Sequence, residues 1–270
     1  MKMLSVSSGY ESEIQNAGYA ILPGRLFQIP SHLARNWKTF VKSWELLPQD
    51  DSISGAYCYR FRRYSRLVCY PHENKIERLP HASFFQSASN NHLYGGIKRE
   101  FAPVLPREIK NAVLRHLIGI DFCHFGVSPK YLNPRWFVGV HQIRIVGRRG
   151  HPGMPTPEGM HRDGSHFIGM HLVGRRNVRG GYTRISDQDG NGLAITCLTY
   201  PLDSIVVDDT RVRHAVTPIQ PLDPNEPAVR DMLILTYDTV VDKDARKMGH
   251  YRNRRHRLVS SASVSKQKKK

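Results

Sequence analysis

The sequence has few cysteines, and none of them is paired in a CxxC spacing. Its 270 residues contain four, at Cys58, Cys69, Cys123 and Cys197. This distribution argues against a disulfide scaffold and against a zinc knuckle. It predicts buried thiols in a cytosolic protein.

Long apolar runs are also missing. No stretch approaches the roughly 18 to 20 apolar residues that a membrane-spanning helix needs. Residues 1–6 lack the apolar core of a secretory signal. We therefore expect a cytoplasmic protein without a membrane segment.

Motifs for nucleotide binding and for a serine nucleophile are absent as well. The sequence has no P-loop and no convincing GxGxxG, which argues against nucleotide-driven chemistry. Ser83, Ser87 and Ser165 have no evident base partner, so we do not expect a serine nucleophile.

Positive charge, by contrast, is in excess. The formal net charge is +17, from 40 Lys and Arg residues against 23 Asp and Glu residues. Part of it lies in residues 252–257 and 266–270, within a basic tail at 246–270 that we expect to be disordered. Elsewhere the basic residues are scattered, apart from a stretch with aromatics at 57–70. The pattern favours small anionic substrates over a nucleic-acid partner, and it leaves the oligomeric state open.

Apolar periodicity predicts two helices in the N-terminal half. The first is expected at residues 31–44, with Ser31 as its cap, and the second at 106–119, with Pro106 in its first turn. Between them, residues 57–64 alternate aromatic and basic side chains as a strand would, and residues 84–97 resemble a loop leading over a site.

From residue 136 onward the pattern changes to short strands separated by Gly, Pro, Asp and Asn. The expected strands are residues 136–146, 166–174, 182–186, 193–200, 204–208, 212–216 and 229–237. Strands without intervening helices predict a mainly β member of the α+β class with a double-stranded β-helix, or jelly-roll, core. We expect one domain over residues 1–245, in which residues 1–130 pack on and cover a core formed by residues 131–245.

The most informative pattern is His161-Arg162-Asp163, followed by the distant His214. Residues i and i+2 of an extended strand share a face, so His161 and Asp163 can bind one metal ion while Arg162 points away. A third ligand from His214, on a later strand, completes the two-histidine, one-carboxylate set of open ferrous sites. Such a site leaves positions for a chelating cosubstrate and for dioxygen.

Arg230 is the second candidate for the site. It heads an otherwise apolar strand, so we expect its guanidinium to face the barrel interior and to need an anionic partner. The distal carboxylate of a dicarboxylic cosubstrate would be one such partner. An internal salt bridge with Asp231 or Asp209 is the alternative.

Three further polar residues are candidates for ligand contacts. Gln142 and Arg144 share a strand face, and both could point inward at a carboxylate, although Arg144 could equally lie on the surface of an edge strand. His166 follows Asp163 closely and could touch the substrate, although alternation places it opposite a direct metal ligand. We treat His171 as structural.

Several segments together resemble the bacterial L-isoleucine 4-hydroxylase-like family of Fe(II)/2-oxoglutarate dioxygenases, which hydroxylate free amino acids. The resemblance covers roughly residues 20–240. It rests on residues 64–66, 85–86, 94–97, 99–103, 159–164, 180–181, 203–209, 213–219 and 230–234.

This resemblance implies Fe(II), 2-oxoglutarate and dioxygen as cofactor and cosubstrates. It places the iron ligands at His161, Asp163 and His214, and the 2-oxoglutarate arginine at Arg230. Relatives in the wider superfamily often carry Ser or Thr two residues after this arginine, where this chain has Met232. A second contact to the distal carboxylate must therefore come from elsewhere.

The resemblance also implies a free L-amino acid, or a similar metabolite, as the substrate. Substrate contacts are expected from the segment 84–96, including Gln86, and from Arg144 and His166, while Gln142 would assist Arg230 with the cosubstrate. Two alternatives stay open at this point: an oxygenase of the same type that acts on nucleic acid or protein, and a non-catalytic, cupin-like metal-binding module.

Overall fold

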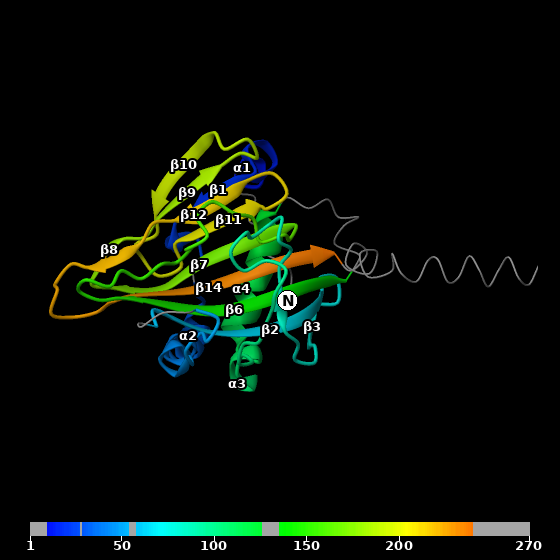
Figure 1. Cartoon of the computed structure of the whole chain (residues 1–270). Helices are drawn as coiled ribbons and strands as arrows, with labels where there is room; N and C mark the ends of the chain where they lie inside the picture. The colour runs from blue at the N-terminus through cyan, green and yellow to red at the C-terminus, as the bar shows by residue number, and fades with distance from the viewer. Residues whose placement is uncertain (1–9, 28, 54–57, 126–134, 240–270) are drawn as a thin grey trace, which may run out of the picture.

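The computed structural model describes residues 10–27, 29–53, 58–125 and 135–239 (Figure 1). The expected basic tail at 246–270 and residue 57 of the expected first strand lie outside these ranges. Among the described residues, every helix is too short or too polar to cross a bilayer.

The N-terminal half contains the helices and four short strands besides one long strand, among the residues that the structure describes. In chain order its elements are α1 (Tyr10–Ala17), β1 (Tyr19–Leu22), η1 (Gly24–Leu26), η2 (Ser31–Leu33), α2 (Ala34–Lys42), η3 (Ser43–Leu46), β2 (Arg60–Tyr70), β3 (Lys75–Arg78), β4 (Phe84–Phe85), β5 (Lys98–Arg99), α3 (Pro106–Ile109) and α4 (Ala112–His124).

The C-terminal half is built from strands. They are β6 (Trp136–Gly147), β7 (Phe167–Arg176), β8 (Val178–Gly180), β9 (Tyr182–Ser186), β10 (Gly192–Cys197), β11 (Ser204–Asp208), β12 (Arg213–Val216), β13 (Ile219–Pro221) and β14 (Ala228–Thr239). The seven strands expected in this half are all present, with β9 and β11 at their predicted bounds.

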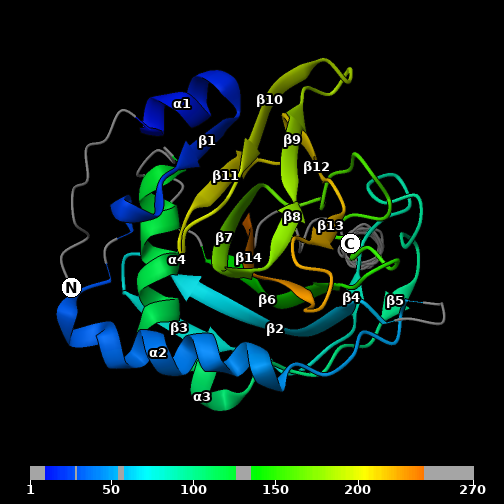
Figure 2. The same ribbon diagram turned by 90° about the vertical axis from the view of Figure 1, so that its left-hand side faces the viewer.

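Two main sheets face each other to form the jelly roll. The larger has the order β1-β11-β7-β14-β6-β2-β3, and the smaller has the order β10-β9-β12, with β13-β8 as a further pair. Figures 1 and 2 show α2, α3 and α4 on one side of the larger sheet and the smaller sheet on its other side. The mainly β, jelly-roll prediction is confirmed.

Strand alternation divides the larger sheet into a helix side and an interior side. On β14, Leu233, Leu235 and Tyr237 pack with the helices in the main apolar core. Met232 and Ile234, which alternate with them along the strand, face the smaller sheet and contact its apolar cluster. Both faces of the central strands are therefore buried, and residues one apart lie in different environments.

The two predicted helices exist but are interrupted. The first consists of η2, α2 and η3, and Ser31 makes no capping bond, because η2 starts after Pro30 without a side-chain cap. The second breaks between α3, which has Pro106 in its first turn, and α4. The side chain of Asn111 accepts a hydrogen bond from the Val113 amide and starts α4 anew.

Candidate active site

His161, Asp163 and His214 meet at one end of the barrel interior. The candidate ligand atoms of these three residues all lie within 4.8 Å of one another. Asp163 Oδ1 is 3.6 Å from His161 Nε2, and Asp163 Oδ2 is 4.0 Å from His214 Nε2. The two imidazole rings are 4.5 Å apart between centroids. The predicted convergence of the three side chains is confirmed by this geometry.

Backbone pairing explains how residues so distant in sequence come together. His214 lies on β12, and its backbone exchanges two hydrogen bonds with that of His161, of 3.0 and 3.1 Å. His161 is thus an isolated bridge residue. Our expectation that His161 and Asp163 lie in a regular strand was wrong, because the chain leaves the bridge immediately and turns at Gly164 before β7 begins.

A buried carboxylate holds this turn in place. Asp209 accepts hydrogen bonds from the backbone amides of Asp163, Gly164 and Ser165, at 3.1, 2.7 and 3.1 Å. Gly164 has φ +83°, a backbone conformation that residues with a Cβ rarely adopt, and a Cβ there would also clash with the side-chain Nδ2 of Asn90. The turn therefore requires glycine, and Asp209 fixes the direction from which the Asp163 side chain enters the site.

Replacement of Asp209 by alanine should weaken metal binding without unfolding the protein. Three amides would lose their acceptor and the Asp163 turn would loosen, so we expect metal affinity to fall about 10- to 100-fold. Anaerobic Mn(II) titration by calorimetry measures this, with circular dichroism as the check on folding. Unchanged affinity would show that Asp209 does not position the site.

The histidines differ in their electrostatic surroundings. Burial disfavours the charged form of His161, but Asp163 and Glu158 outweigh it and raise the His161 pKa to about 9. Burial and the neighbouring His161 lower the His214 pKa to about 4. The Asp163 pKa is strongly lowered by its two histidine neighbours despite burial. Asp163 is thus ionised and His214 neutral at pH 7, the forms that bind a metal ion, whereas His161 would lose its proton when the metal binds.

The donor set fits a ferrous ion. Two imidazoles and one carboxylate, clustered on one side, match the open octahedral sites of non-haem iron. His161 Nδ1 is 3.0 Å from the Gly159 carbonyl, which orients the ring with Nε2 toward Asp163. We find no fourth His, Cys, Asp or Glu in this group among the described residues, so part of the coordination sphere is left to small molecules.

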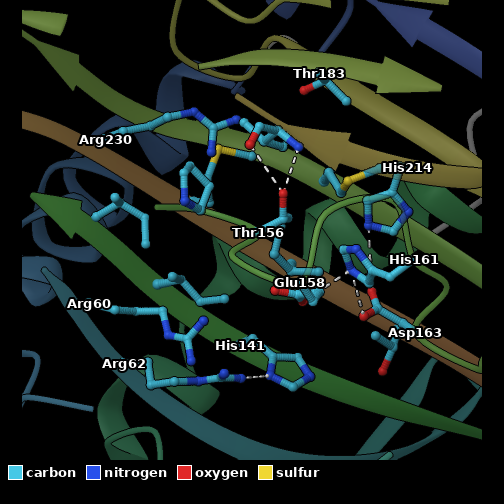
Figure 3. Close-up of a pocket in the computed structure, with 18 of the residues that line it drawn as sticks. Arg60, Arg62, His141, Thr156, Glu158, His161, Asp163, Thr183, His214 and Arg230 are labelled. Atoms are coloured by element: carbon cyan, nitrogen blue, oxygen red, sulfur yellow. Dashed lines mark hydrogen bonds and ion pairs between the residues drawn. The ribbon is translucent and has the colours of Figure 1, made fainter. Parts of the chain in front are cut away.

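A pocket extends from these residues into the barrel (Figure 3). Its apolar wall comes from interior-facing residues of several strands: Ile143, Ile145, Met170, Leu198, Ile205, Val216, Met232 and Ile234. Its polar residues include Arg230 on β14, Arg60 and Arg62 on β2, and Arg99 on β5, and the strands β14 and β2 pair with opposite edges of β6. Figure 3 shows Arg230 and the Arg60–Arg62 pair at separate places, both away from the cluster of His161, Asp163 and His214.

Arg230 lies where the sequence analysis expected it. It lines the pocket and is buried, and in the part of the chain that the structure describes its Nε has no hydrogen-bond partner. The alternative internal salt bridge is not formed, since Asp231 pairs with Arg144 and Asp209 binds backbone amides. Burial and the nearby Arg175 lower the Arg230 pKa to about 10, so the guanidinium is charged at pH 7 and suits a carboxylate ligand.

Gln142 and Arg144 were assigned to the wrong face of β6. The residues of β6 that line the pocket are His141, Ile143 and Ile145, so their neighbours point to the helix side. Gln142 donates a 2.7 Å hydrogen bond to Ser43 Oγ, and Arg144 forms a two-bond ion pair with Asp231 at 2.7 and 2.8 Å. Neither the cofactor contact of Gln142 nor the substrate contact of Arg144 is supported.

The ion pair between Arg144 and Asp231 should contribute to the stability of the fold. Arg144→Gln should lower the free energy of unfolding by on the order of 2 kcal/mol, because it leaves a mostly buried Asp231 without its partner. The Michaelis constants for all substrates should stay unchanged. Urea unfolding of Arg144→Gln, Asp231→Asn and the double variant measures the coupling, and a selective loss of substrate affinity would contradict this assignment.

Of the two remaining candidates for substrate contacts, His166 lies outside the pocket and Gln86 lines it. His166 lies outside the pocket lining, with Nδ1 3.4 Å from Asp238 and its ring against Trp136, so a substrate contact is not supported. Gln86 lines the pocket, and its Nε2 donates a 2.9 Å hydrogen bond to Asp163 Oδ1. His171 is fully buried, hydrogen-bonded to Ser204 and Asp121, and does not line the pocket.

Five titratable pocket residues were not predicted from the sequence: Arg60, Arg62, Arg99, His141 and Glu158. Arg60 and Arg62 belong to the alternating stretch that we had noted, but its basic face was not recognised as the buried one. Glu158 precedes His161 by one helical turn's spacing and could have been noted as a neighbouring carboxylate.

Comparison with known proteins agrees with this site. The family model for 2OG-Fe dioxygenase matches residues 41–236. The chain belongs to this family, and it is an Fe(II)- and 2-oxoglutarate-dependent dioxygenase.

The three similar proteins described next share 24% to 30% sequence identity with this chain. The chain is 26% identical to an L-isoleucine-4-hydroxylase of Bacillus thuringiensis, over 70% of this chain and 78% of the relative. It is 24% identical to a 3(1)-hydroxy-L-isoleucine 4-dioxygenase of Pantoea ananatis, over 87% and 98%. A crystal structure of a bsmA homologue from Methylobium petroleophilum superposes with a TM-score of 0.73 at 30% identity, covering 86% of this chain and 92% of that one.

Proposed function

We propose that this dioxygenase hydroxylates an unactivated carbon of a free L-amino acid or an amino-acid-like metabolite. The observation that carries the proposal is one barrel-interior pocket that contains both the His161–Asp163–His214 group and the buried Arg230. The two relatives named for isoleucine and hydroxyisoleucine support an amino acid as the substrate.

In this proposal, His161, Asp163 and His214 hold Fe(II), and Arg230 binds the distal carboxylate of 2-oxoglutarate. The bound iron, with 2-oxoglutarate and dioxygen, supplies the oxidant that inserts one oxygen atom into a C–H bond while 2-oxoglutarate becomes succinate and CO2.

The remaining pocket residues position Asp163 and shield the site from water. Gln86 holds one oxygen of Asp163, which leaves the other directed toward His214. The apolar wall formed by residues such as Ile143, Met232 and Ile234 lets the aliphatic part of a substrate pack and excludes water.

Anaerobic reconstitution with Fe(II) and 2-oxoglutarate, followed by air and an amino-acid panel, tests the proposal. The panel contains leucine, isoleucine, methionine, lysine, arginine, proline and pipecolate. We expect at least one member to stimulate succinate release and to gain one oxygen atom in equal amount. Stimulation by oligonucleotides or peptides, but by no amino acid, would instead favour a macromolecular substrate.

A further inference from the structure

Three arginines share one wall of the pocket. Arg60 and Arg62 come from the interior face of β2, and Arg99 comes from β5; they are 4%, 6% and 6% exposed. Their guanidiniums lie against aromatic rings, with Arg62 3.9 Å from the ring centre of Phe101 and Arg99 5.1 Å from that of Phe84. These contacts hold the arginines in place and shield them from water.

The protein balances only part of this charge. Arg60 forms a 2.6 Å ion pair with Asp50. Arg62 instead donates to His141 Nδ1, and Arg99 to the side-chain carbonyl of Gln86, both at 2.7 Å. Within the ranges that the structure describes, neither Arg62 nor Arg99 has a carboxylate at ion-pair distance, although buried charges are normally paired.

The hydrogen bonding of the three arginines and the pKa of Arg62 also indicate excess positive charge on this wall. Arg60 Nη2, Arg62 Nε and Arg99 Nε are buried and find no hydrogen-bond partner among the described residues. Burial and the repulsion from Arg60 and Arg99 lower the Arg62 pKa to about 9, so the residue stays charged at pH 7. The wall therefore has the surplus positive charge that an anionic ligand group would neutralise.

A buried carboxylate stands between this wall and the candidate metal ligands. Glu158 lines the same pocket with a side chain only 9% exposed. Its Oε1 accepts a 3.2 Å hydrogen bond from Asn91 and lies 3.7 Å from His161 Nε2, while no described residue forms a hydrogen bond with its Oε2. Figure 3 shows Glu158 beside His161, on the side of the pocket that faces Arg60 and Arg62.

We propose that these groups form a subsite for the zwitterionic head of the substrate: the arginine wall of Arg60, Arg62 and Arg99 binds the α-carboxylate, and Glu158 binds the α-ammonium. This inference rests on the proposed function, since it assumes an amino-acid substrate. It assigns Arg230 and the arginine wall to different carboxylates, which explains why one small pocket needs anion-binding groups in two places.

The subsite has a consequence for specificity. An N-acylated amino acid, or any residue of a peptide after the first, lacks the α-ammonium group and would leave Glu158 buried without a cation. An amide or ester lacks the carboxylate and would leave the arginine wall unbalanced. Unpaired buried charges give strong discrimination, so the enzyme should accept free amino acids only.

The first test uses L-isoleucine, L-leucine and L-methionine, each beside its N-acetyl, amide and 2-hydroxy-acid analogue. Succinate release above the rate without amino acid is the readout. We expect each derivative to lower kcat/KM about 100-fold or more relative to the free amino acid that is turned over. Equal turnover of a free amino acid and its N-acetyl or amide form would overturn the subsite and leave the dioxygenase function intact.

The second test uses the isosteric variant Glu158→Gln and the variant Arg99→Gln, with the exposed Glu226→Gln and Arg35→Gln as matched controls. Each pocket variant should raise the KM for the amino acid about 10- to 100-fold. Mn(II) binding should be retained, with its affinity changed far less than the KM for the amino acid. The KM for 2-oxoglutarate should stay unchanged, and Arg99→Lys should restore part of the loss.

Three results separate the possibilities. Loss of Mn(II) binding by Glu158→Gln would identify Glu158 as a metal ligand and overturn its role here. An unchanged KM for the amino acid in both pocket variants would overturn the subsite. A wild-type enzyme that no free amino acid stimulates would instead overturn the proposed function on which the subsite rests.

Discussion

Asp163→Ala should reduce amino-acid-dependent succinate formation by more than about 100-fold. Residues that only orient metal ligands typically cost 10- to 100-fold when removed, and Asp163 is placed to bind the metal itself. Its loss also removes the negative charge that offsets the two adjacent histidines. Succinate and product are both measured, so that uncoupled 2-oxoglutarate oxidation is detected separately.

A matched control is Asp189→Ala, in the exposed turn between β9 and β10. It removes the same charge without touching the pocket and should keep wild-type activity. Asp163→Ala should also lose Mn(II) binding while its circular dichroism spectrum stays native. Wild-type-like succinate formation by Asp163→Ala would refute the metal-ligand assignment.

Arg230→Gln should raise the KM for 2-oxoglutarate about 100-fold or more. Removing one partner of a buried charge pair costs several kcal/mol, and the nearby Arg175 does not line the pocket and so cannot replace the lost contact with the distal carboxylate. The KM for the amino acid should change little, because the arginine wall is a separate place in the pocket.

Arg230→Lys separates charge from geometry. It keeps the positive charge but loses the planar, two-bond recognition of a carboxylate, so we expect an intermediate KM for 2-oxoglutarate. Arg35→Gln, on the exposed face of α2, is the control for loss of an arginine. A rise in the KM of the amino acid alone would show that Arg230 serves the substrate instead.

The sequence predicted the elements that carry a strong periodic signal. The strands of the C-terminal half follow from alternation. The convergence of His161, Asp163 and His214 was predicted from the known donor set of ferrous sites and not from alternation, because His161 and Asp163 lie outside a regular strand. Arg230 was predictable because a charged residue at the start of an apolar strand needs a partner.

The face that each strand turns toward the barrel interior, and the conformation of the loops around the site, could not be predicted in the same way. Both sides of β6 are buried, so alternation shows that Gln142 and His141 differ but not which of them faces the barrel. The role of Asp209 depends on a backbone turn, which leaves no periodic mark in the sequence. The arginine wall joins β2 to β5 because Arg60 and Arg62 share the rings of Tyr94 and Phe101 with Arg99, although both rings lie far along the chain from β2.

The most direct test of the account is the position of the metal. A crystal grown without oxygen, with Mn(II) in place of Fe(II) and with 2-oxoglutarate, locates the ion by anomalous scattering. We expect one peak within coordination distance of His161 Nε2, His214 Nε2 and an Asp163 carboxylate oxygen, with the remaining positions filled by non-protein ligands. A peak elsewhere, or an ion enclosed entirely by protein groups, would contradict the account.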